Sequence, residues 1–203
     1  MIARYRTPHP NYVHLLFVTP SKHLHVLKDG RLKWQDKPME VKLREISSSD
    51  REHVVYFLLA DHCSSAFYAE VHSCRRLPAA KDFLLRAWRR KEDHFFHGLP
   101  NMTVVPKTVE QMEPDIRPFI ESHGVTPAPA ESGFKAGVHQ IRTFENSFAN
   151  SISWHPDATI TDVGKYTDEA MLRLNESPLS RTGETRRAMW ERGVMSPGVL
   201  LTI

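Results

Sequence analysis

The sequence lacks the features that define secreted and membrane-spanning proteins. Its two cysteines, Cys63 and Cys74, are too few for a disulfide framework, and we interpret both as buried thiols. No apolar run approaches the roughly 20 residues that a membrane span requires. The N-terminal MIARYRTPHP has no apolar signal-peptide core. We therefore expect a cytoplasmic protein with no membrane partner.

A strong charge of one sign is also lacking. The chain has 27 basic and 24 acidic residues, a net charge of +3 and a pI near 8.9. This surplus favours a polyanionic partner only slightly. Twelve histidines are spread along the 203 residues, which argues against one dedicated metal cluster. Length and composition are typical of one globular domain.

The first quarter of the chain reads as β-rich. Residues 12–18, YVHLLFV, predict a strand, and Asp29-Gly30 between two alternating runs predicts a tight hairpin. The sequence ISSSD at 46–50 is typical of a linker. We therefore divide the chain into a β-rich N-terminal extension, a core and a tail, at residues 1–50, 51–193 and 194–203.

The core begins with a continuous apolar run at 54–60, which predicts a strand buried on both faces. Residues 66–73 follow a short turn and should pair with it in antiparallel orientation. Further short strands are predicted at 102–105 and 125–128. Helices are predicted at 77–91, 113–123, 138–152, 168–175 and 184–192, with Trp88 and Trp190 in the core. This order predicts a mixed α/β protein with helices on both faces of a small sheet.

Several motifs in this order resemble the catalytic core of retroviral-type integrases and DDE transposases. The motifs are ADHCSSAFYAEV (60–71), GLPNMTVV (98–105), FIESHGVTP (119–127), SGFKAGVHQIRTFENSF (132–148) and RLNESPLSRTGETRRAMWERG (173–193). The resemblance covers about residues 52–193. It implies a ribonuclease H-like fold, in which a mixed sheet is flanked by helices.

The resemblance also implies a site of three acids that hold two Mg²⁺ or Mn²⁺ ions around a phosphate. It assigns the first acid, at the end of the central strand, to Asp61. Pro106 stands where the second acid is expected, and Gln140 stands where the third is expected. Proline has no ligand atom, and an amide brings no negative charge. We therefore expect a degenerate member without intact catalytic residues and without a cofactor, in which Asp61 is the one candidate metal ligand.

Two surfaces follow from this reading. A polar cleft is expected to contain Asp61, His62, Lys107, His139 and Gln140. A basic helix and its approach are expected to contact nucleic-acid phosphates, although such a run is also typical of a solvated helix face. Its residues are Arg75, Arg76, Lys81, Arg86, Arg89, Arg90 and Lys91.

The leading hypothesis is an integrase-like protein of a mobile element or plasmid. It would bind DNA, or a protein partner from a recombination or defence system, without cleavage. One alternative is an active metal-dependent nuclease with a relocated site around Asp61, which would use Mg²⁺ or Mn²⁺ together with Glu131 or histidines. The other is a non-enzymatic module that forms a homodimer.

Overall fold

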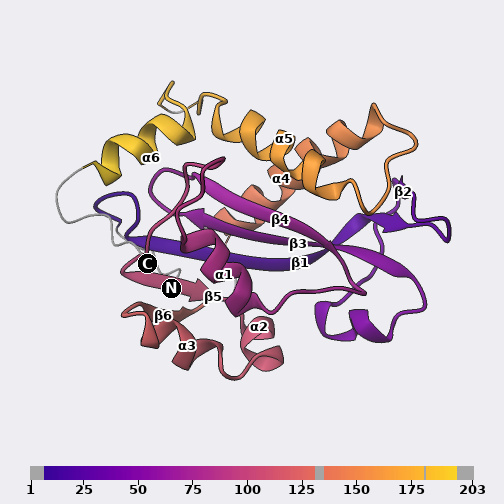
Figure 1. Ribbon diagram of the computed structural model, residues 1–203, viewed down its shortest axis with the longest axis horizontal. Coiled ribbons are helices and arrows are strands. Elements are labelled where there is room, and N and C mark those ends of the chain that lie inside the picture. Colours follow the sequence, from indigo (N-terminus) through magenta and orange to yellow (C-terminus); the bar gives the residue numbers. More distant parts are fainter. Residues whose placement is uncertain (1–6, 131–134, 181, 196–203) are drawn as a thin grey trace.

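A six-stranded mixed sheet forms the centre of the computed structural model, which describes residues 7–130, 135–180 and 182–195 (Figure 1). The strands are β1 (Val13–Val26), β2 (Leu32–Trp34), β3 (Glu52–Asp61), β4 (Phe67–Ser73), β5 (Met102–Val105) and β6 (Thr126–Pro129). Their order is β4-β3-β1-β5-β6, and β2 pairs with the far part of β1. β3 runs antiparallel to both β1 and β4, whereas β5 is parallel to both β1 and β6.

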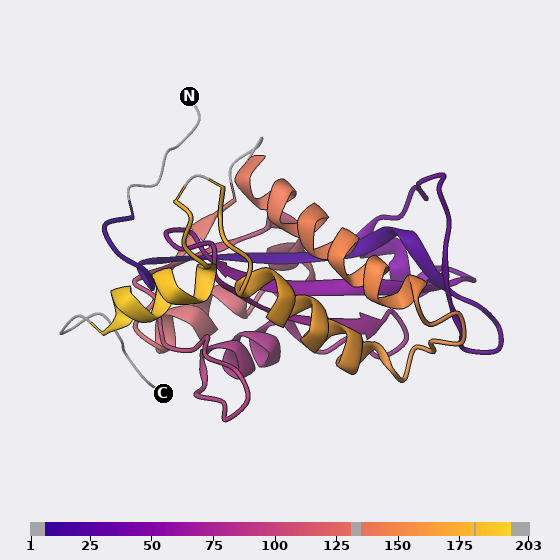
Figure 2. The same ribbon diagram turned by 90° about the horizontal axis from the view of Figure 1, so that it is seen from above.

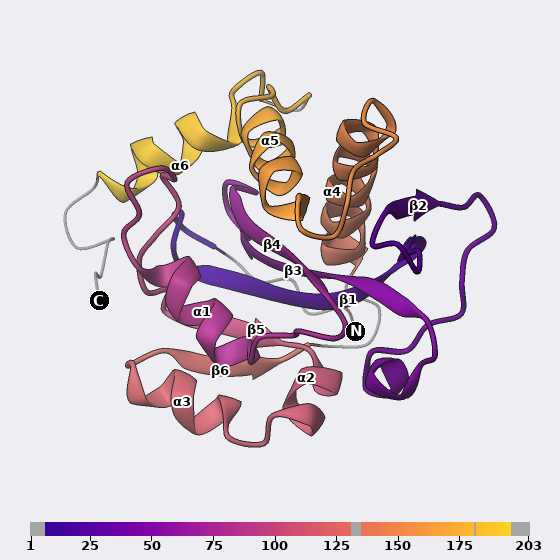
Figure 3. The ribbon, with the colours of Figure 1, turned by 45° about the vertical axis from the view of Figure 1, so that its right-hand side comes forward.

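Helices cover both faces of this sheet, as Figure 3 shows. They are η1 (Leu43–Ser48), α1 (Ala80–Trp88), α2 (Lys107–Met112), α3 (Ile116–Ser122), α4 (Lys135–Ser153), α5 (Val163–Asn175) and α6 (Arg186–Val194). Helices α1 to α3 lie on one face, and α4 and α5 lie side by side on the other (Figure 2). The predicted mixed α/β class is confirmed.

The predicted boundary at residue 50 is wrong, because β1 is the middle strand of the sheet. Residues 13–26 therefore belong to the core and not to an N-terminal extension. Only the first half of β1 looks like a strand in the sequence. Pro20 interrupts the apolar pattern, and the pairing with β3 shifts register between Pro20 and His25.

The predicted hairpin at Asp29-Gly30 is confirmed. The amide of Leu27 donates to the carbonyl of Arg31 at 2.8 Å, and that of Gly30 donates to Leu27 at 2.9 Å. Gly30 has a φ of 86°, which glycine adopts without steric cost. The loop after α4 holds the far side of β2, since Leu32 donates to the carbonyl of Ala158 at 2.8 Å.

β3 divides the core in two, as its continuous apolar run predicts. Alternate residues such as Phe57 pack with α1, while Tyr56 and its alternates pack with α4 and α5. Both predicted core tryptophans, Trp88 and Trp190, are fully buried. Cys74 is buried as expected, but Cys63 is only half-buried.

Most predicted helices lie within a few residues of the observed ones, with two larger differences. α2 was missed, because it has only six residues and follows Pro106 directly, so its periodicity is too short to read. α5 begins at Val163, five residues before the predicted start, because Gly164 and Lys165 conceal the pattern.

Both edges of the sheet are closed to further strands. At the β4 edge, Asn175 acts as a substitute strand, because its side-chain amide donates to the carbonyl of Phe67 at 3.0 Å and accepts from its N–H at 3.3 Å. At the β6 edge, the outward positions are Pro127 and Pro129, which carry no N–H. The sheet therefore presents little template for aggregation.

Candidate functional site

Asp61 ends β3 and is completely buried. Its carboxylate accepts hydrogen bonds from the backbone N–H of Asn11 at 2.8 Å, the N–H of Ser64 at 2.6 Å and the hydroxyl of Ser64 at 2.7 Å. Burial raises the pKa of Asp61 to about 6 despite these hydrogen bonds, which lower it. The carboxylate thus closes the turn between β3 and β4.

The strand that ends at Asp61 is not the central strand, so the position implied for the first acid is wrong. β3 lies next to β1, and Asp61 pairs in register with His14 near the start of β1. Leu59 faces the α1 side and Ala60 faces the α4 side, so strand alternation directs Asp61 toward α1. β1 itself, VHLLFVTPSKHLHV, contains no Asp or Glu.

The register between β5 and β1 shows which residue of the central strand lies level with Pro106. Leu15 pairs with Val104, and both belong to one apolar cluster with Val13. Two residues further along each strand, Phe17 and Pro106 therefore lie level and on the same face. Asp61 lies about 10 Å back along the strands, at about 3.3 Å per residue, and on the opposite face. Phe17 could not be predicted from the sequence, because only the order of the strands shows that β1 is the central strand.

Gln140 approaches this face from α4. It lies one turn before the fully buried Phe144, and its Oε1 is buried with no hydrogen-bond partner among the described residues. Phe144 and half-buried Phe17 border the same apolar cluster between the sheet and α4. The nearby Glu145 does not substitute for an acid here, because it accepts a hydrogen bond from the Ser21 hydroxyl at 2.5 Å.

The five residues of the predicted polar cleft are distributed over separate parts of the molecule. His62 lies in the turn after Asp61, with its Nδ1 3.1 Å from the hydroxyl of Thr7. Lys107 opens α2 beyond the opposite end of β5, and His139 is exposed on α4. Across the described ranges, no three His, Cys, Asp or Glu side chains are grouped to hold a metal ion.

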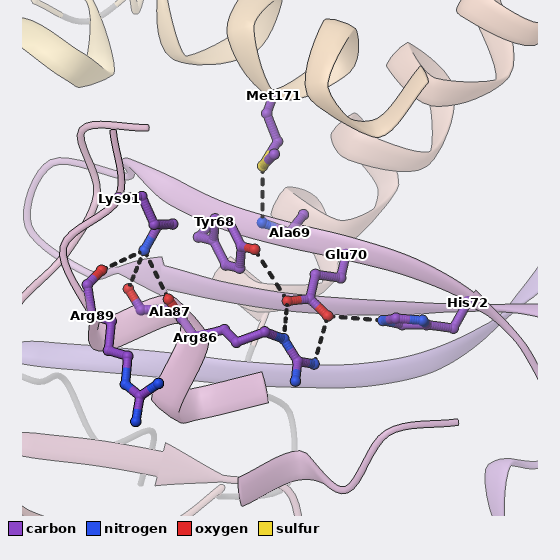
Figure 4. A network of polar contacts seen from close by, with 9 residues as sticks. All are labelled: Tyr68, Ala69, Glu70, His72, Arg86, Ala87, Arg89, Lys91 and Met171. Carbon is purple, nitrogen blue, oxygen red and sulfur yellow. Dashed lines mark hydrogen bonds and ion pairs between the residues drawn. The ribbon is translucent and has the colours of Figure 1, made fainter. Parts of the chain in front are cut away.

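Several of the predicted phosphate-binding residues already have partners. Arg86 forms a two-pronged ion pair with Glu70 at 2.8 Å, and Lys81 pairs with Asp115 at 2.5 Å (Figure 4 shows the first pair). Burial would raise the pKa of Glu70, but Arg86 and His72 together lower it to about 2. Arg86 is thus committed to the sheet.

Lys91 and Arg75 bind backbone carbonyls. The Lys91 ammonium donates to the carbonyls of Arg86, Ala87 and Arg89 at 2.8–2.9 Å and caps the end of α1 (Figure 4). Burial lowers the pKa of Lys91 to about 8. Arg75 donates to carbonyls of the loop before β3. Three exposed arginines of the predicted patch remain available: Arg76, Arg89 and Arg90.

The fold is that of retroviral integrase catalytic cores, which is ribonuclease H-like. Two similar solved structures are the HTLV-2 integrase catalytic core domain in complex with magnesium, in dimeric and trimeric forms. Their TM-scores are 0.59 and 0.57 at 12% and 13% identity, and each match covers 91% of this chain and 99% of the other. A chain of the simian T-cell lymphotropic virus intasome in complex with PP2A regulatory subunit B56 gamma gives a TM-score of 0.57 at 14% identity, over 91% of this chain and 57% of that chain. The sequence matches no family model and no curated protein.

Magnesium is named with two of these neighbours, but the residues of this chain do not fit it. Mg²⁺ requires hard oxygen ligands and is usually bound through carboxylates. Phe17 and Pro106 provide no ligand atom, and Gln140 provides one neutral oxygen. Asp61, the candidate ligand, is buried on the other face of the sheet.

No helix within the described residues is long and apolar enough to cross a bilayer.

Proposed function

We propose that this chain is a catalytically degenerate, integrase-like protein that binds nucleic acid without cutting it. One observation carries the proposal. The positions where the resemblance and the sheet order together require acids are occupied by Phe17, Pro106 and Gln140. Two-metal phosphoryl transfer cannot be assembled from an aromatic ring, an imino acid and an amide.

Fold and charge support nucleic acid as the ligand. The fold is that of integrase catalytic cores, which suggests a nucleic-acid-related function by analogy, and the net charge of +3 favours polyanions. In this proposal the protein is cytoplasmic and comes from a mobile element or plasmid. A protein partner from a recombination or defence system would supply the activity that this chain lacks.

The interaction-module alternative is favoured by a specific surface feature. A groove of about 1050 Å³ runs between the α1–β5 loop, α5 and α6. Leu172 in its wall is 63% exposed and gives the groove an apolar contact point. Six acidic and four basic residues line this groove, so its charge is mixed with an acidic excess, which favours a protein surface, including a second copy of this chain, over nucleic acid.

The relocated-nuclease alternative requires Asp61 to leave three hydrogen-bond donors and reach solvent. Its proposed companion Glu131 lies outside the described residues. No contact of Asp61 favours this alternative, since Asn11 and Ser64 already occupy its oxygens.

The test is a titration of labelled DNA and RNA at two salt concentrations, with and without Mn²⁺, followed by analysis of the strands. We expect salt-dependent binding and intact strands. Cleavage that requires Mn²⁺ and disappears in Asp61→Asn would establish the nuclease alternative. Absence of binding, combined with a dimer in solution, would establish the interaction module.

A further inference from the structure

The positive charge of this protein is concentrated in the β1–β2 hairpin. Residues 22–37 contain five basic and two acidic residues, which leaves 22 basic and 22 acidic residues in the other 187. The hairpin thus carries a net charge equal to that of the whole chain. One of its acids, Asp29, is already paired with Arg31 at 2.7 Å. The exposed lysines of the hairpin are Lys22, Lys28, Lys33 and Lys37.

An aromatic platform lies on this hairpin. The rings of Trp34 and His23 stack with centroids 4.7 Å apart and planes inclined by 13°. His23 is fixed in turn, because its Nδ1 lies 3.0 Å from the carbonyl of Gln35. Trp34 remains 39% exposed, so His23 supports the indole while part of it stays open to a ligand.

A groove of about 610 Å³ adjoins this platform, between the hairpin and α4. Figure 3 shows β2 beside the C-terminal half of α4. Lys33 and Trp34 form one wall, and the amide side chains of Asn146 and Asn150 belong to the other. Its described lining contains no Asp or Glu, in contrast to the groove beside α5. With the apolar residues Leu24, Leu32 and Ile152, this lining combines an apolar and stacking surface, amide donors and acceptors, and the positive charge of Lys33.

The second exposed tryptophan stands in the chain between two residues that line this groove. Trp154 is 82% exposed, and its neighbours Ser153 and His155 both line the groove. The remaining tryptophans, Trp88 and Trp190, are completely buried. One of the two exposed indoles, Trp34, therefore lies on the charged hairpin, and the other, Trp154, stands next in the chain to residues of the adjoining groove.

From these observations we infer that the hairpin and its groove bind single-stranded nucleic acid. A base stacks on Trp34, and the hairpin lysines neutralise the backbone phosphates on either side. A single strand is required because the bases of a duplex have their faces covered, whereas an unpaired base offers a face to an aromatic ring. This inference rests on the proposed function, and it assigns that function to a surface other than the α1 residues.

The hairpin is held rigidly enough to serve as a platform. Besides its pairing with β1, it is joined to the loop after α4 through the bridge between Arg31 and Thr159 and through the hydrogen bond from Leu32 to Ala158. The amide of Gln35 donates to the carbonyl of His23 at 2.9 Å. Little ordering is therefore needed when a strand binds.

The experiment measures binding of a labelled oligo-dT of about 16 nucleotides and of a duplex of equal length, over a range of salt concentrations. The first variants are Trp34→Ala and Trp34→Phe, each checked by thermal unfolding. We expect Trp34→Ala to weaken single-strand binding by at least roughly tenfold, the loss of one stacked base. Trp34→Phe should recover much of that loss, and indole fluorescence of the wild type should be quenched on binding.

A matched pair of charge variants completes the design. Lys22, Lys33 and Lys37→Gln and the α1 triple Arg76, Arg89 and Arg90→Gln remove the same charge from different surfaces. We expect the hairpin triple to reduce the logarithmic salt slope by about 2, and the α1 triple to change it much less.

Two results would overturn this inference and can be told apart. If the wild type binds but the hairpin variants bind equally well, the hairpin is not the site while the proposed function stands. If the wild type binds neither probe, both fail, and the groove becomes a candidate protein contact.

Discussion

Two regions lie on opposite faces of the sheet beside the first half of β1. One contains the carboxylate of Asp61, and the other contains the amide of Gln140. On the α1 face, Asp61 is surrounded by donors and lies beside buried His14. On the α4 face, Phe17 and Pro106 lie level on β1 and β5, and Oε1 of Gln140 on α4 is buried with no hydrogen-bond partner among the described residues. We propose that these three residues replace the acids of an integrase-like site.

The difference between these regions shows that a carboxylate at the end of a buried strand can have a structural role. Asp61 is conspicuous because it ends an apolar strand, but its carboxylate is occupied by Ser64 in the following turn and by the backbone of Asn11 before β1, which are structural contacts. On the α4 face, none of Phe17, Pro106 and Gln140 carries a charge. We expect the buried carboxylate of Asp61 to contribute more to stability than the side-chain amide of Gln140.

Asp61→Ala should lower the free energy of unfolding by about 3 kcal/mol. The substitution leaves the buried N–H groups of Asn11 and Ser64 without their acceptor, at about 1–3 kcal/mol each. Urea unfolding measures the loss. Asp162→Ala is the matched control, since Asp162 accepts the same kind of turn hydrogen bonds from Thr159 but is exposed. Equal losses in both variants would contradict the special role of the buried carboxylate.

Asp61 and His14 should give opposite pH dependences. Burial lowers the pKa of His14 from 6.5 to about 3, so its contribution to stability is present above pH 6.5 and is lost as the pH falls toward 3. The raised pKa of Asp61 has the reverse effect, since that contribution is present below pH 3.8 and is lost as the pH rises through about 6. Between pH 4 and 6 the two contributions oppose each other in the wild type.

Single variants should separate these contributions. Relative to wild type, His14→Gln should gain about 1.4 kcal/mol per unit as the pH falls from 6.5 to 4.5. Asp61→Asn should gain a similar amount per unit as the pH rises from 4 to 6. Denaturant unfolding at several pH values measures both slopes, and slopes of the same sign would refute the assignment.

Gln140→Met should change the free energy of unfolding by no more than about 1 kcal/mol. The buried amide oxygen has no partner among the described residues, so its removal also removes the free-energy cost of taking it out of water. Glutamine and methionine side chains have similar volumes. Phe144→Ala, one turn further along α4, is the contrasting control and should cost about 3–5 kcal/mol because it opens a cavity. A large loss in Gln140→Met would reveal a polar partner on the α4 face.

The strands β3 and β4 could be predicted closely, since a long apolar run followed by a turn has few other interpretations. β1 could not be placed, because strand order depends on long-range pairing and its sequence is broken by Pro20 and by histidines. Because the sequence pattern favours β3 as the central strand, the first acid position is assigned to Asp61. The other two implied acid positions, Pro106 and Gln140, stay predictions, and they rest on local elements of the sequence. Phe17 depends on register, and no local signal indicates it.

The measurement that tests the central claim most directly is the fate of bound nucleic acid. Labelled single-stranded and duplex DNA would be incubated with the purified chain and Mn²⁺ at low and moderate salt, and both the bound fraction and the strand length would be recorded. The account predicts binding that weakens as salt rises, with every strand intact. Strand cleavage that is unaffected by Asp61→Asn but abolished by Gln140→Ala would contradict it, because the α4 face would then be catalytic.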